Sequence, residues 1–325
     1  MRMKIIQPSY EILTRDEQRG GLAIIERAAR TCYRSEDAIA EGSAERLVKS
    51  LIRRGHLSVI EHGAYAFEII DEKLFEVIVH GLCALRKQLA EPPRITATHV
   101  NGRMIISGNC RAWRELTALS EEFISGGAVA MYFIPYIDRA YIGDICDVTM
   151  YGADERIKPM TDAKLLKDPA QARIHMRQTV RFVIDRGVSH EFVRHRKFSF
   201  SQESTRYCNY SQGRFGSEIT VIEPCYLTPG TVAYDFWEDA CRSAERDYMR
   251  LIKLQRPAQE ARAVLPISTK TELVMTGTFA QWEHFFDLRA RQLTGAAHPQ
   301  AVEVAQPLMR EMAVRFPHVM GGEPV

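Results

Sequence analysis

The order of strand-like and helix-like stretches limits the folds open to this chain. Stretches typical of strands occur at 3–9, 64–70, 94–100, 103–107, 179–185, 217–223 and 269–276. Apolar residues recur at helical spacing around 16–30, 42–55, 72–90, 108–124, 232–254 and 298–314. Because the two kinds of stretch intermix without a regular β-α-β alternation, a doubly wound parallel sheet is disfavoured. The sequence predicts an α+β fold in which a largely antiparallel mixed sheet is flanked by helices.

The middle of the chain differs from the rest. Residues 92–172 are richer in loop-like segments, and we predict one domain over 1–325 with an insertion at about 92–172. One internal likeness crosses this boundary. The stretches "ISGNCRAWREL" (106–116) and "MTGTFAQWEHF" (275–285) share the pattern Gly-x-x-x-x-Trp, and each leads into a predicted helix. A structural repeat and a chance likeness both remain open.

Three local signals predict where elements begin, end or turn. Gly55 follows an amphipathic stretch and suits the end of a helix. An Asn-Gly pair at 101–102 predicts a tight turn between two strands. The stretch "GVSHEFVRHR" (187–196) predicts a short helix with Ser189 as its N-cap.

Bulk properties and missing motifs exclude several classes of protein. The formal net charge of +2 is too small for a surface that binds long polyanions. The chain has no apolar run of membrane-spanning length, no signal-peptide pattern at its start and no Cys-x-x-Cys among its seven cysteines. We therefore expect a cytoplasmic protein with reduced thiols and with neither a membrane nor a nucleic acid as partner.

Sequence signatures of common sites are also missing. The glycine-rich fingerprints of nucleotide-binding folds and the Gly-x-Ser-x-Gly elbow do not occur. The two histidines of "HLSVIEH" (56–62) are six residues apart, whereas metal-binding pairs on one helix face are three or four apart. We expect no metal site.

The densest cluster of polar side chains is "RHRKFSFSQESTRYCNYSQGR" (194–214), with five Lys or Arg residues and one acid, Glu203. Such focal positive charge suits a small anionic ligand. On a helix, Arg194 and Arg196 would lie about 200° apart and would serve different ligands or different subunits.

An extended chain beyond that helix would bring an amide, a hydroxyl and a guanidinium to one side: Gln202, Ser204 and Arg206. These groups suit a phosphorylated polar ring, because Arg binds phosphate oxygens in bidentate fashion. A solvated basic turn with ordinary surface ion pairs explains the composition equally well.

The same stretch carries a family signature. Arg194-His195-Arg196, followed after seven residues by Ser204, resembles the signature of the flavin-dependent thymidylate synthases, the ThyX family. The longer stretch 182–211 resembles the longer members of that family. Further matching blocks occur in the same order at 27–33, 53–69, 261–266, 284–290 and, more weakly, 297–303. The likeness spans most of the chain outside 92–172.

The resemblance implies an activity and an assembly. Members of the family make dTMP from dUMP with a methylene group from methylene-tetrahydrofolate and a hydride from reduced FAD, which NADPH regenerates. They work as homotetramers whose flavin sites are shared between subunits. The expected fold is the ThyX-like form of the α+β class.

The resemblance also assigns substrate residues. Those implied to contact dUMP are Glu191, Gln202, Glu203, Ser204, Thr205, Arg206, Arg262 and Arg289. Arg289 would favour the N3-ionised uracil, since a fixed cation lowers the pKa of that nitrogen and raises electron density at C5. Ser204 joins Arg289 in the catalytic set, but no adjacent general base activates it, so its role is to position the substrate.

The residues implied to bind FAD are Ser58, Glu61, Arg194, His195, Arg196, Thr278, His284 and His298. Cations suit the pyrophosphate, and hydrogen bonds tune the isoalloxazine ring. His56 and His62 are candidates for the vicinity of the flavin and the folate. A purely structural role for these two histidines remains open.

Two departures from the family pattern affect this assignment. Thr278-Phe279-Ala280 stands where the family often has Asn-x-Arg, while Asn109 and Arg111 occupy the equivalent points of the internal likeness. We hypothesise that the insertion takes over part of the flavin-binding role. Glu191 replaces a commoner glutamine, which exchanges an amide donor for an acceptor.

Two alternative functions remain. One is a related flavoprotein that binds a uridine nucleotide without the folate-dependent step, which the altered segment 278–280 favours. The other is a non-enzymatic nucleic-acid-binding protein that uses the basic stretch, for which tight and strongly salt-dependent binding is expected.

Overall fold

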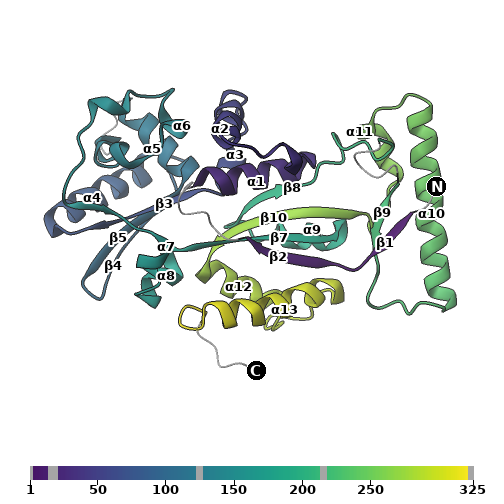
Figure 1. Cartoon of the computed structure of the whole chain (residues 1–325). Coiled ribbons are helices and arrows are strands. Elements are labelled where there is room, and N and C mark those ends of the chain that lie inside the picture. The colour runs from purple at the N-terminus through teal and green to yellow at the C-terminus, as the bar shows by residue number, and fades with distance from the viewer. Residues whose placement is uncertain (1–2, 14–20, 122–126, 213–217, 321–325) are drawn as a thin grey trace.

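The structure is a computed structural model that describes residues 3–13, 21–121, 127–212 and 218–320 (Figure 1). Its strands are β1 (Lys4–Ile6), β2 (Ser9–Leu13), β3 (Ala64–Ile69), β4 (Ile95–Val100), β5 (Arg103–Asn109), β6 (Ile157–Pro159), β7 (Arg177–Asp185), β8 (Ser199–Gln202), β9 (Thr220–Ile222) and β10 (Lys270–Thr278).

The longer helices are α1 (Gly21–Tyr33), α2 (Ser43–Arg53), α4 (Glu72–Gln88), α5 (Cys110–Glu121), α10 (Val232–Lys253), α12 (Phe279–Arg289) and α13 (Pro299–Arg315). The short helices are α3 (Leu57–Ile60), α6 (Arg139–Ile142), α7 (Asp162–Leu165), α8 (Pro169–His175), α9 (Arg186–Phe192) and α11 (Ala258–Ala261). Turns of 3₁₀ helix are η1 (Glu36–Ala38), η2 (Gly127–Tyr132), η3 (Ile134–Tyr136), η4 (Val148–Met150) and η6 (Arg262–Val264).

The central sheet has the strand order β2-β7-β10-β8, and every pairing in it is antiparallel. All nine residues of β10 are buried, because helices cover both faces of the sheet. Figure 1 shows α1 on one face and α12 with α13 on the other. Phe182, Trp282, Phe285 and Leu308 belong to the apolar core between the sheet and the C-terminal helices.

A second antiparallel sheet has the order β4-β5-β3-β6 and is built largely from the predicted insertion. Side chains alternate between its two faces, as the pleat requires. Phe67 and Ile106 join the core formed with α4 and α5, whereas Ala66 and Ile105 pack with Ala172 of α8 on the other face. The segment that looked rich in loops therefore contributes three of the four strands of this sheet.

The third part of the molecule is the short parallel pair β1–β9 with the long helix α10, at the right of Figure 1. Tyr248 and Met249 of α10 pack with Val221 of β9 in a separate small core.

The predicted α+β class with largely antiparallel pairing is confirmed, although the strands form separate sheets rather than one. Each predicted helix exists within the described residues, and the parts of 16–30 and 108–124 that lie at 16–20 and 122–124 fall outside them. Strands β2, β6 and β8 were not among the predicted strands.

Two sequence signals for chain reversals are confirmed. Gly55 follows α2 with φ +72°, and the amides of Gly55 and His56 donate to the carbonyls of Ile52 and Leu51, as in a Schellman motif. Asn101 and Gly102 both have positive φ, as a two-residue turn between antiparallel strands requires.

The expected helix through 187–196 is wrong in two respects. Helix α9 begins at Arg186 and is capped by Asp185, whose Oδ1 accepts from the amide of Val188 at 2.6 Å. Ser189 lies inside the helix and donates to the carbonyl of Arg186 instead. The helix also ends at Phe192, so the argument that placed Arg194 and Arg196 on opposite helix faces does not apply.

All seven cysteines lie in the described residues and none of them forms a disulfide, as predicted. None of the helices in the described ranges combines the length and the apolar character needed to cross a bilayer.

Candidate active site

A cavity of about 800 Å³ lies between the loop that precedes β8 and the helix α12. The loop contributes Arg194, His195, Arg196, Lys197 and Phe198, and the helix contributes Ala280, Gln281, His284, Leu288 and Arg289, with Thr278 at its N-cap. The remaining lining residues come from α8, β7 and the insertion strand β4: Ile174, Arg177 and Thr96.

The cavity has a strongly positive lining. Four arginines and one lysine line it, and no Asp or Glu is among its lining residues. Arg194 and Arg196 lie on one tight turn, in which the amide of Arg196 donates to the carbonyl of Arg194, and both line this cavity. The focal positive charge seen in the sequence therefore becomes a concave site that favours an anionic ligand.

His195 is buried at the inner end of this loop. Its Nε2 accepts a hydrogen bond from Nε of Arg289 at 3.2 Å. Burial, and then the nearby Arg289 and His284, lower the pKa of His195 to about 4. The imidazole is therefore neutral at pH 7, with its proton on Nδ1, and it orients the guanidinium without adding charge.

Arg289 is held on its other side by Glu191 at the end of α9. Nη1 of Arg289 lies 2.7 Å from Oε2 of Glu191, and Nη2 donates to the Glu191 carbonyl at 3.3 Å. The structure thus brings Arg289 of α12 together with Glu191 and His195, which lie at the end of α9 and in the loop that follows it.

Other predicted substrate residues lie beyond the far end of β8. The chain turns after Glu203 instead of remaining extended: the amide of Cys208 donates to the carbonyl of Ser204, and the amide of Arg206 to its Oγ. Arg262 donates to Oγ1 of Thr205 at 3.3 Å. The turn 204–206 and Arg262 form a second polar group, and none of these residues lines the cavity that contains Arg289.

The guanidinium groups of Arg206 and Arg262 are accessible in this second cluster of polar residues. Arg206 is exposed and stacks over the ring of Tyr207 at 5.6 Å from its centroid, and Arg262 is also exposed. Both remain free to meet a phosphate. Arg214, at the end of the basic stretch, lies outside the described residues.

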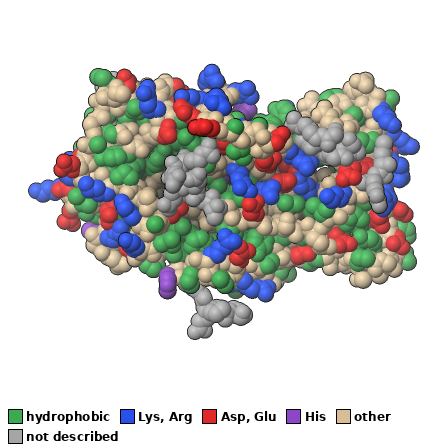
Figure 2. All heavy atoms as spheres, viewed as in Figure 1, with side chains coloured by type: hydrophobic (Ala, Val, Ile, Leu, Met, Phe, Trp, Pro, Cys, Tyr) green, Lys and Arg blue, Asp and Glu red, His purple; other side chains and the backbone are tan. Residues whose placement is uncertain are grey.

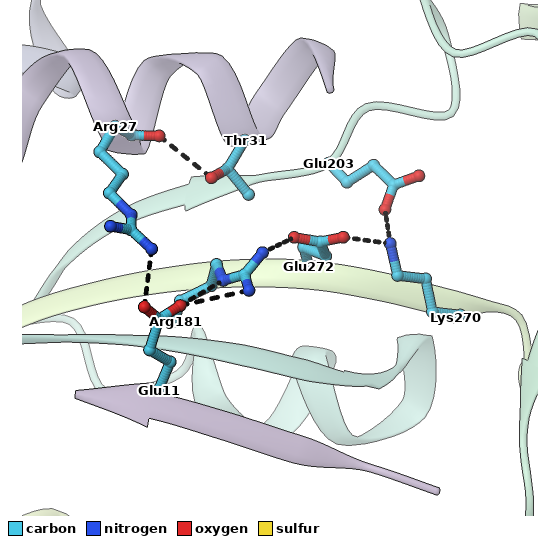
Figure 3. A network of polar contacts seen from close by, with 7 residues as sticks. All are labelled: Glu11, Arg27, Thr31, Arg181, Glu203, Lys270 and Glu272. Carbon is cyan, nitrogen blue, oxygen red and sulfur yellow. Dashed lines mark hydrogen bonds and ion pairs between the residues drawn. The ribbon is translucent and has the colours of Figure 1, made fainter. Parts of the chain in front are cut away.

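Glu203 points inward, beneath this turn, and does not face an open cavity. Its Oε2 accepts from Nζ of Lys270 at 2.8 Å, and Lys270 also binds Glu272 at 2.5 Å. Figure 3 shows this chain of charges continuing from the buried Lys270 through the partly buried Arg181 of β7 to the more exposed Glu11 of β2. Burial alone raises the pKa of Glu272, but Lys270 and Arg181 more than offset it, so this pKa is lowered.

Gln202 also supports the turn from below. Its Nε2 donates to Ser189 at 2.9 Å and to Thr271 at 3.2 Å. Gln202 and Glu203 therefore tie the end of β8 to α9 and β10.

The loop around α3 supplies the other predicted flavin residues. Oε1 of Glu61 accepts from Nη1 of Arg111 at 2.9 Å, and Ser199 Oγ lies 3.3 Å from both Oε2 and the carbonyl of Glu61. Ser58 is exposed on the same loop. Glu61 lines a second cavity, of about 430 Å³, together with Arg94, Asn109 and Arg111.

The two histidines of this loop differ. His62 is buried and bonds to Thr276 through Nδ1 at 2.7 Å and to Ser201 through Nε2 at 3.0 Å. Burial lowers the pKa of His62 to about 3, so the ring is neutral and joins β8 to β10. His56 is exposed at the start of α3. The contacts of His62 support a structural role for this residue.

The remaining predicted flavin residues lie on the C-terminal helices: Thr278 is the N-cap of α12, His284 lies within α12, and His298 is the N-cap of α13. Thr278 caps α12 by accepting from the amide of Gln281, and His284 lies 6.1 Å from His195 between ring centroids. His298 is exposed beside Tyr226 and does not line the 800 Å³ cavity.

Several lining residues were missed from the sequence: Thr96, Ile174, Arg177, Lys197 and Gln281. Lys197 adjoins the Arg-His-Arg motif, and this adjacency was a usable signal. Thr96, Ile174 and Arg177 come from distant segments, and nothing local in the sequence marks them.

The fold and this geometry define an α+β protein with a cation-lined cavity suited to an anionic ligand. The model of the family described as "Thymidylate synthase complementing protein" (Thy1) matches residues 15–75 and 165–318, which together are well over half of the chain. The chain belongs to this family. The unmatched middle, 76–164, overlaps most of the predicted insertion.

Curated relatives carry a matching name. The "Flavin-dependent thymidylate synthase" of Corynebacterium aurimucosum is 32% identical over 139 residues, which cover 40% of this chain and 56% of that protein. The protein of the same name from Corynebacterium glutamicum is 31% identical over 153 residues, covering 42% and 58%. The chain thus spans little more than half the length of these relatives.

Among solved structures, the chain is similar to the UMP/dUMP methylase PolB of Streptomyces cacaoi bound with 5-Br UMP. The TM-score is 0.42 at 15% identity, with 98% of this chain and 95% of that chain covered.

Proposed function

We propose that this protein is a flavin-dependent thymidylate synthase that converts dUMP to dTMP. Methylene-tetrahydrofolate would supply the carbon, and NADPH would reduce the bound FAD. The observation that carries the proposal is the cavity lined by the Arg194–Arg196 motif and Arg289, in a chain that belongs to the Thy1 family.

The residues of the cavity fit a flavin dinucleotide. The cations of the loop 194–197 suit a pyrophosphate, which accepts charge-assisted hydrogen bonds from guanidinium groups. Phe198 and Leu288 offer apolar surface to a ring, and Gln281 offers the N–H groups of its side-chain amide, whose oxygen is used by the helix cap. When bound, the flavin supplies the hydride that completes the methyl group. Arg194, His195, Arg196 and His284 would hold it.

Arg289 has the chemistry that the nucleotide requires. Its guanidinium is fixed between Glu191 and the neutral His195, so it presents a pre-oriented cation. A cation beside uracil N3 favours the ionised ring and makes C5 more nucleophilic without reorganisation at the moment of reaction. Arg206 and Arg262 would bind the phosphate, and Ser204 would position the nucleotide.

These residues fall into two groups on one chain. Four residues of β8, about 13 Å of extended chain, lie between the loop of Arg194–Phe198 and the segment of Ser204 and Arg206. This separation supports a site completed by a second copy of the chain. Assembly as a homotetramer, a cytoplasmic location and a single domain with an insertion at 92–172 remain predictions.

The purified full-length protein provides the test. We expect the absorbance of oxidised flavin after addition of FAD, a change in that spectrum on addition of dUMP, and dTMP formation only with methylene-tetrahydrofolate and NADPH both present. A protein that binds FAD and dUMP but forms no dTMP would instead be a related flavoprotein without the folate-dependent step. One observation favours this alternative: the hydroxyl of Thr278 is used by the helix cap.

A nucleic-acid-binding function has less support. On the face that Figure 2 shows, Lys and Arg side chains are interspersed with Asp and Glu and form no extended basic surface. A colourless protein that binds oligonucleotides tightly and with steep salt dependence would overturn the enzymatic proposal.

A further inference from the structure

The turn from β5 into α5 repeats the turn from β10 into α12. In both, the last strand residue caps the helix: Asn109 Oδ1 accepts from Ala112 N at 2.8 Å, and Thr278 Oγ1 accepts from Gln281 N at 3.3 Å. The likeness between 106–116 and 275–285 therefore extends to backbone structure and hydrogen bonding.

The glycines and tryptophans of the two turns also have equivalent surroundings. A Cβ at Gly108 would meet Ile95 at 2.4 Å, and a Cβ at Gly277 would meet Phe198 at 2.5 Å, so in each copy an apolar side chain packs closely against the glycine at the strand end. Each buried indole reaches the carbonyl of the residue that pairs with the glycine. Trp282 donates to Gln178 at 3.0 Å, and Trp113 is shared between Tyr65 at 3.4 Å and Gly108 itself at 3.0 Å.

The repeats differ at one position with chemical consequence. The second residue of the helix is Ala280 in one copy, where it lines the 800 Å³ cavity, and Arg111 in the other, where it lines the 430 Å³ cavity. Arg111 bridges Glu61 at 2.9 Å and Glu115 at 2.7 Å. Asn109 is buried and is used by the helix cap, which leaves Arg111 as the group that can act outside the turn.

Arg111 holds the carboxylate of Glu61 on one side, and Ser199 holds it on the other. A carboxylate has about four acceptor sites, so two donors leave it able to accept from a ligand hydroxyl or N–H. Ser199 directly follows Phe198, which lines the larger cavity. Glu61 thus connects the insertion with the loop of the Arg-His-Arg motif.

We propose that Arg111 is a positioning residue for the flavin site: it fixes Glu61 as an acceptor for hydroxyl or N–H groups of the flavin. This inference rests on the proposed function. It would give the insertion a role in cofactor binding. The turn at 278–280 cannot take this role, because Ala280 stands at the position equivalent to Arg111.

The test measures the dissociation constant of FAD for the full chain, freed of flavin, by quenching of flavin fluorescence. Arg111→Ala and Glu61→Gln are each expected to weaken FAD at least about tenfold, the usual cost of one charge-assisted hydrogen bond. The double variant is expected to bind no more weakly than either single one, because both changes remove the same interaction. Arg111→Lys keeps a cation and should recover most of the affinity.

Arg114→Ala is the matched control. Arg114 lies on the same helix and is ion-paired with Asp144, but it does not contact Glu61. Wild-type affinity in Arg114→Ala, together with weakened Arg111→Ala, supports positioning. An equal loss in both variants, with lowered unfolding midpoints, would show a structural effect and overturn the inference.

Near-wild-type FAD affinity in Arg111→Ala also overturns the inference while leaving the proposed function intact. If Arg111→Ala does not fold, Arg111→Gln is measured in its place with the same criteria. A wild-type chain that binds no FAD rejects the proposed function itself, so the two failures are distinguishable.

Discussion

Glu191 and Arg289 form an ion pair at 2.7 Å, although they are 98 residues apart in the sequence. Both side chains are partly buried, and the neutral imidazole of His195 contacts the guanidinium from the other side. This relationship fixes the cation on which the proposed chemistry depends, and it also places a negative charge next to it.

Replacement of Arg289 by alanine is expected to lower turnover by about 100-fold or more, since a lost stabiliser of transition-state charge has effects of this size. FAD is expected to remain bound, because the cations of the loop 194–197 remain. Steady-state dTMP formation and the flavin spectrum measure the two effects. Turnover close to that of the wild type would remove Arg289 from its assigned role.

Glu191→Gln is expected to tighten dUMP binding severalfold. The amide oxygen of glutamine can still accept from Arg289, but the negative charge that offsets the cation is gone, so an anionic nucleotide meets a stronger field. Calorimetric titration with dUMP at low and at physiological salt measures the change. Weaker binding in the variant would mean that the carboxylate itself contacts the nucleotide.

Arg206→Ala is expected to raise the dissociation constant of dUMP while the spectrum of bound flavin stays unchanged. The reason is that Arg206 lies on the turn after β8 and not at the cavity of Arg289. Arg250→Ala, at an exposed arginine of α10, is the control and should bind dUMP normally. An unaltered dUMP affinity in Arg206→Ala would remove that residue from the phosphate site.

Lys270→Met is expected to destabilise the protein by about 3–5 kcal/mol, because it leaves the carboxylates of Glu203 and Glu272 buried without their shared cation. Urea unfolding measures the free energy. Lys49→Met removes an exposed pair with Glu45 and should change stability by less than about 1 kcal/mol. Equal effects in the two variants would contradict the structural role of the buried network.

Acidification is expected to destabilise the fold through His62. Its pKa is about 3 in the folded protein and near 6.5 when unfolded, so the unfolded chain binds more protons between these values. Stability is therefore complete above pH 6.5 and falls as the pH drops toward 3, by up to about 1.4 kcal/mol per pH unit for one proton. Urea unfolding at pH 7 and pH 5 measures this slope.

The comparison variant is His62→Gln, which can bond to Thr276 or Ser201 but does not titrate. Its stability should depend less steeply on pH than that of the wild type over the same range. Identical slopes would assign the acid sensitivity to other groups, such as His175 and His195, whose pKa values are also lowered to about 4 by burial.

Local patterns in the sequence were enough to determine the class of fold. Apolar spacing marked the long helices, and the Asn101-Gly102 pair marked the turn between β4 and β5, because such signals depend on a few neighbouring residues. The Arg194-His195-Arg196 motif with Ser204 could also be recognised from the sequence, since it lies in one continuous stretch. The N-cap of α9 was predicted wrongly because Asp185 and Ser189 both suit that position. The pairing of β7 with β10 runs to Asp185 and so makes Asp185 the residue that precedes the helix.

Only the tertiary structure decided which of the candidate side chains meet. The sequence identified Glu203 as a polar residue beside Ser204. Its burial against Lys270 follows from the pairing of β8 with β10. Thr96 reaches the cavity from a strand 98 residues before Arg194, and Arg177 pairs with Thr278, which follows it by 101 residues. Long-range packing has no local signature, because the free energy that brings such segments together is shared among many apolar contacts across the core.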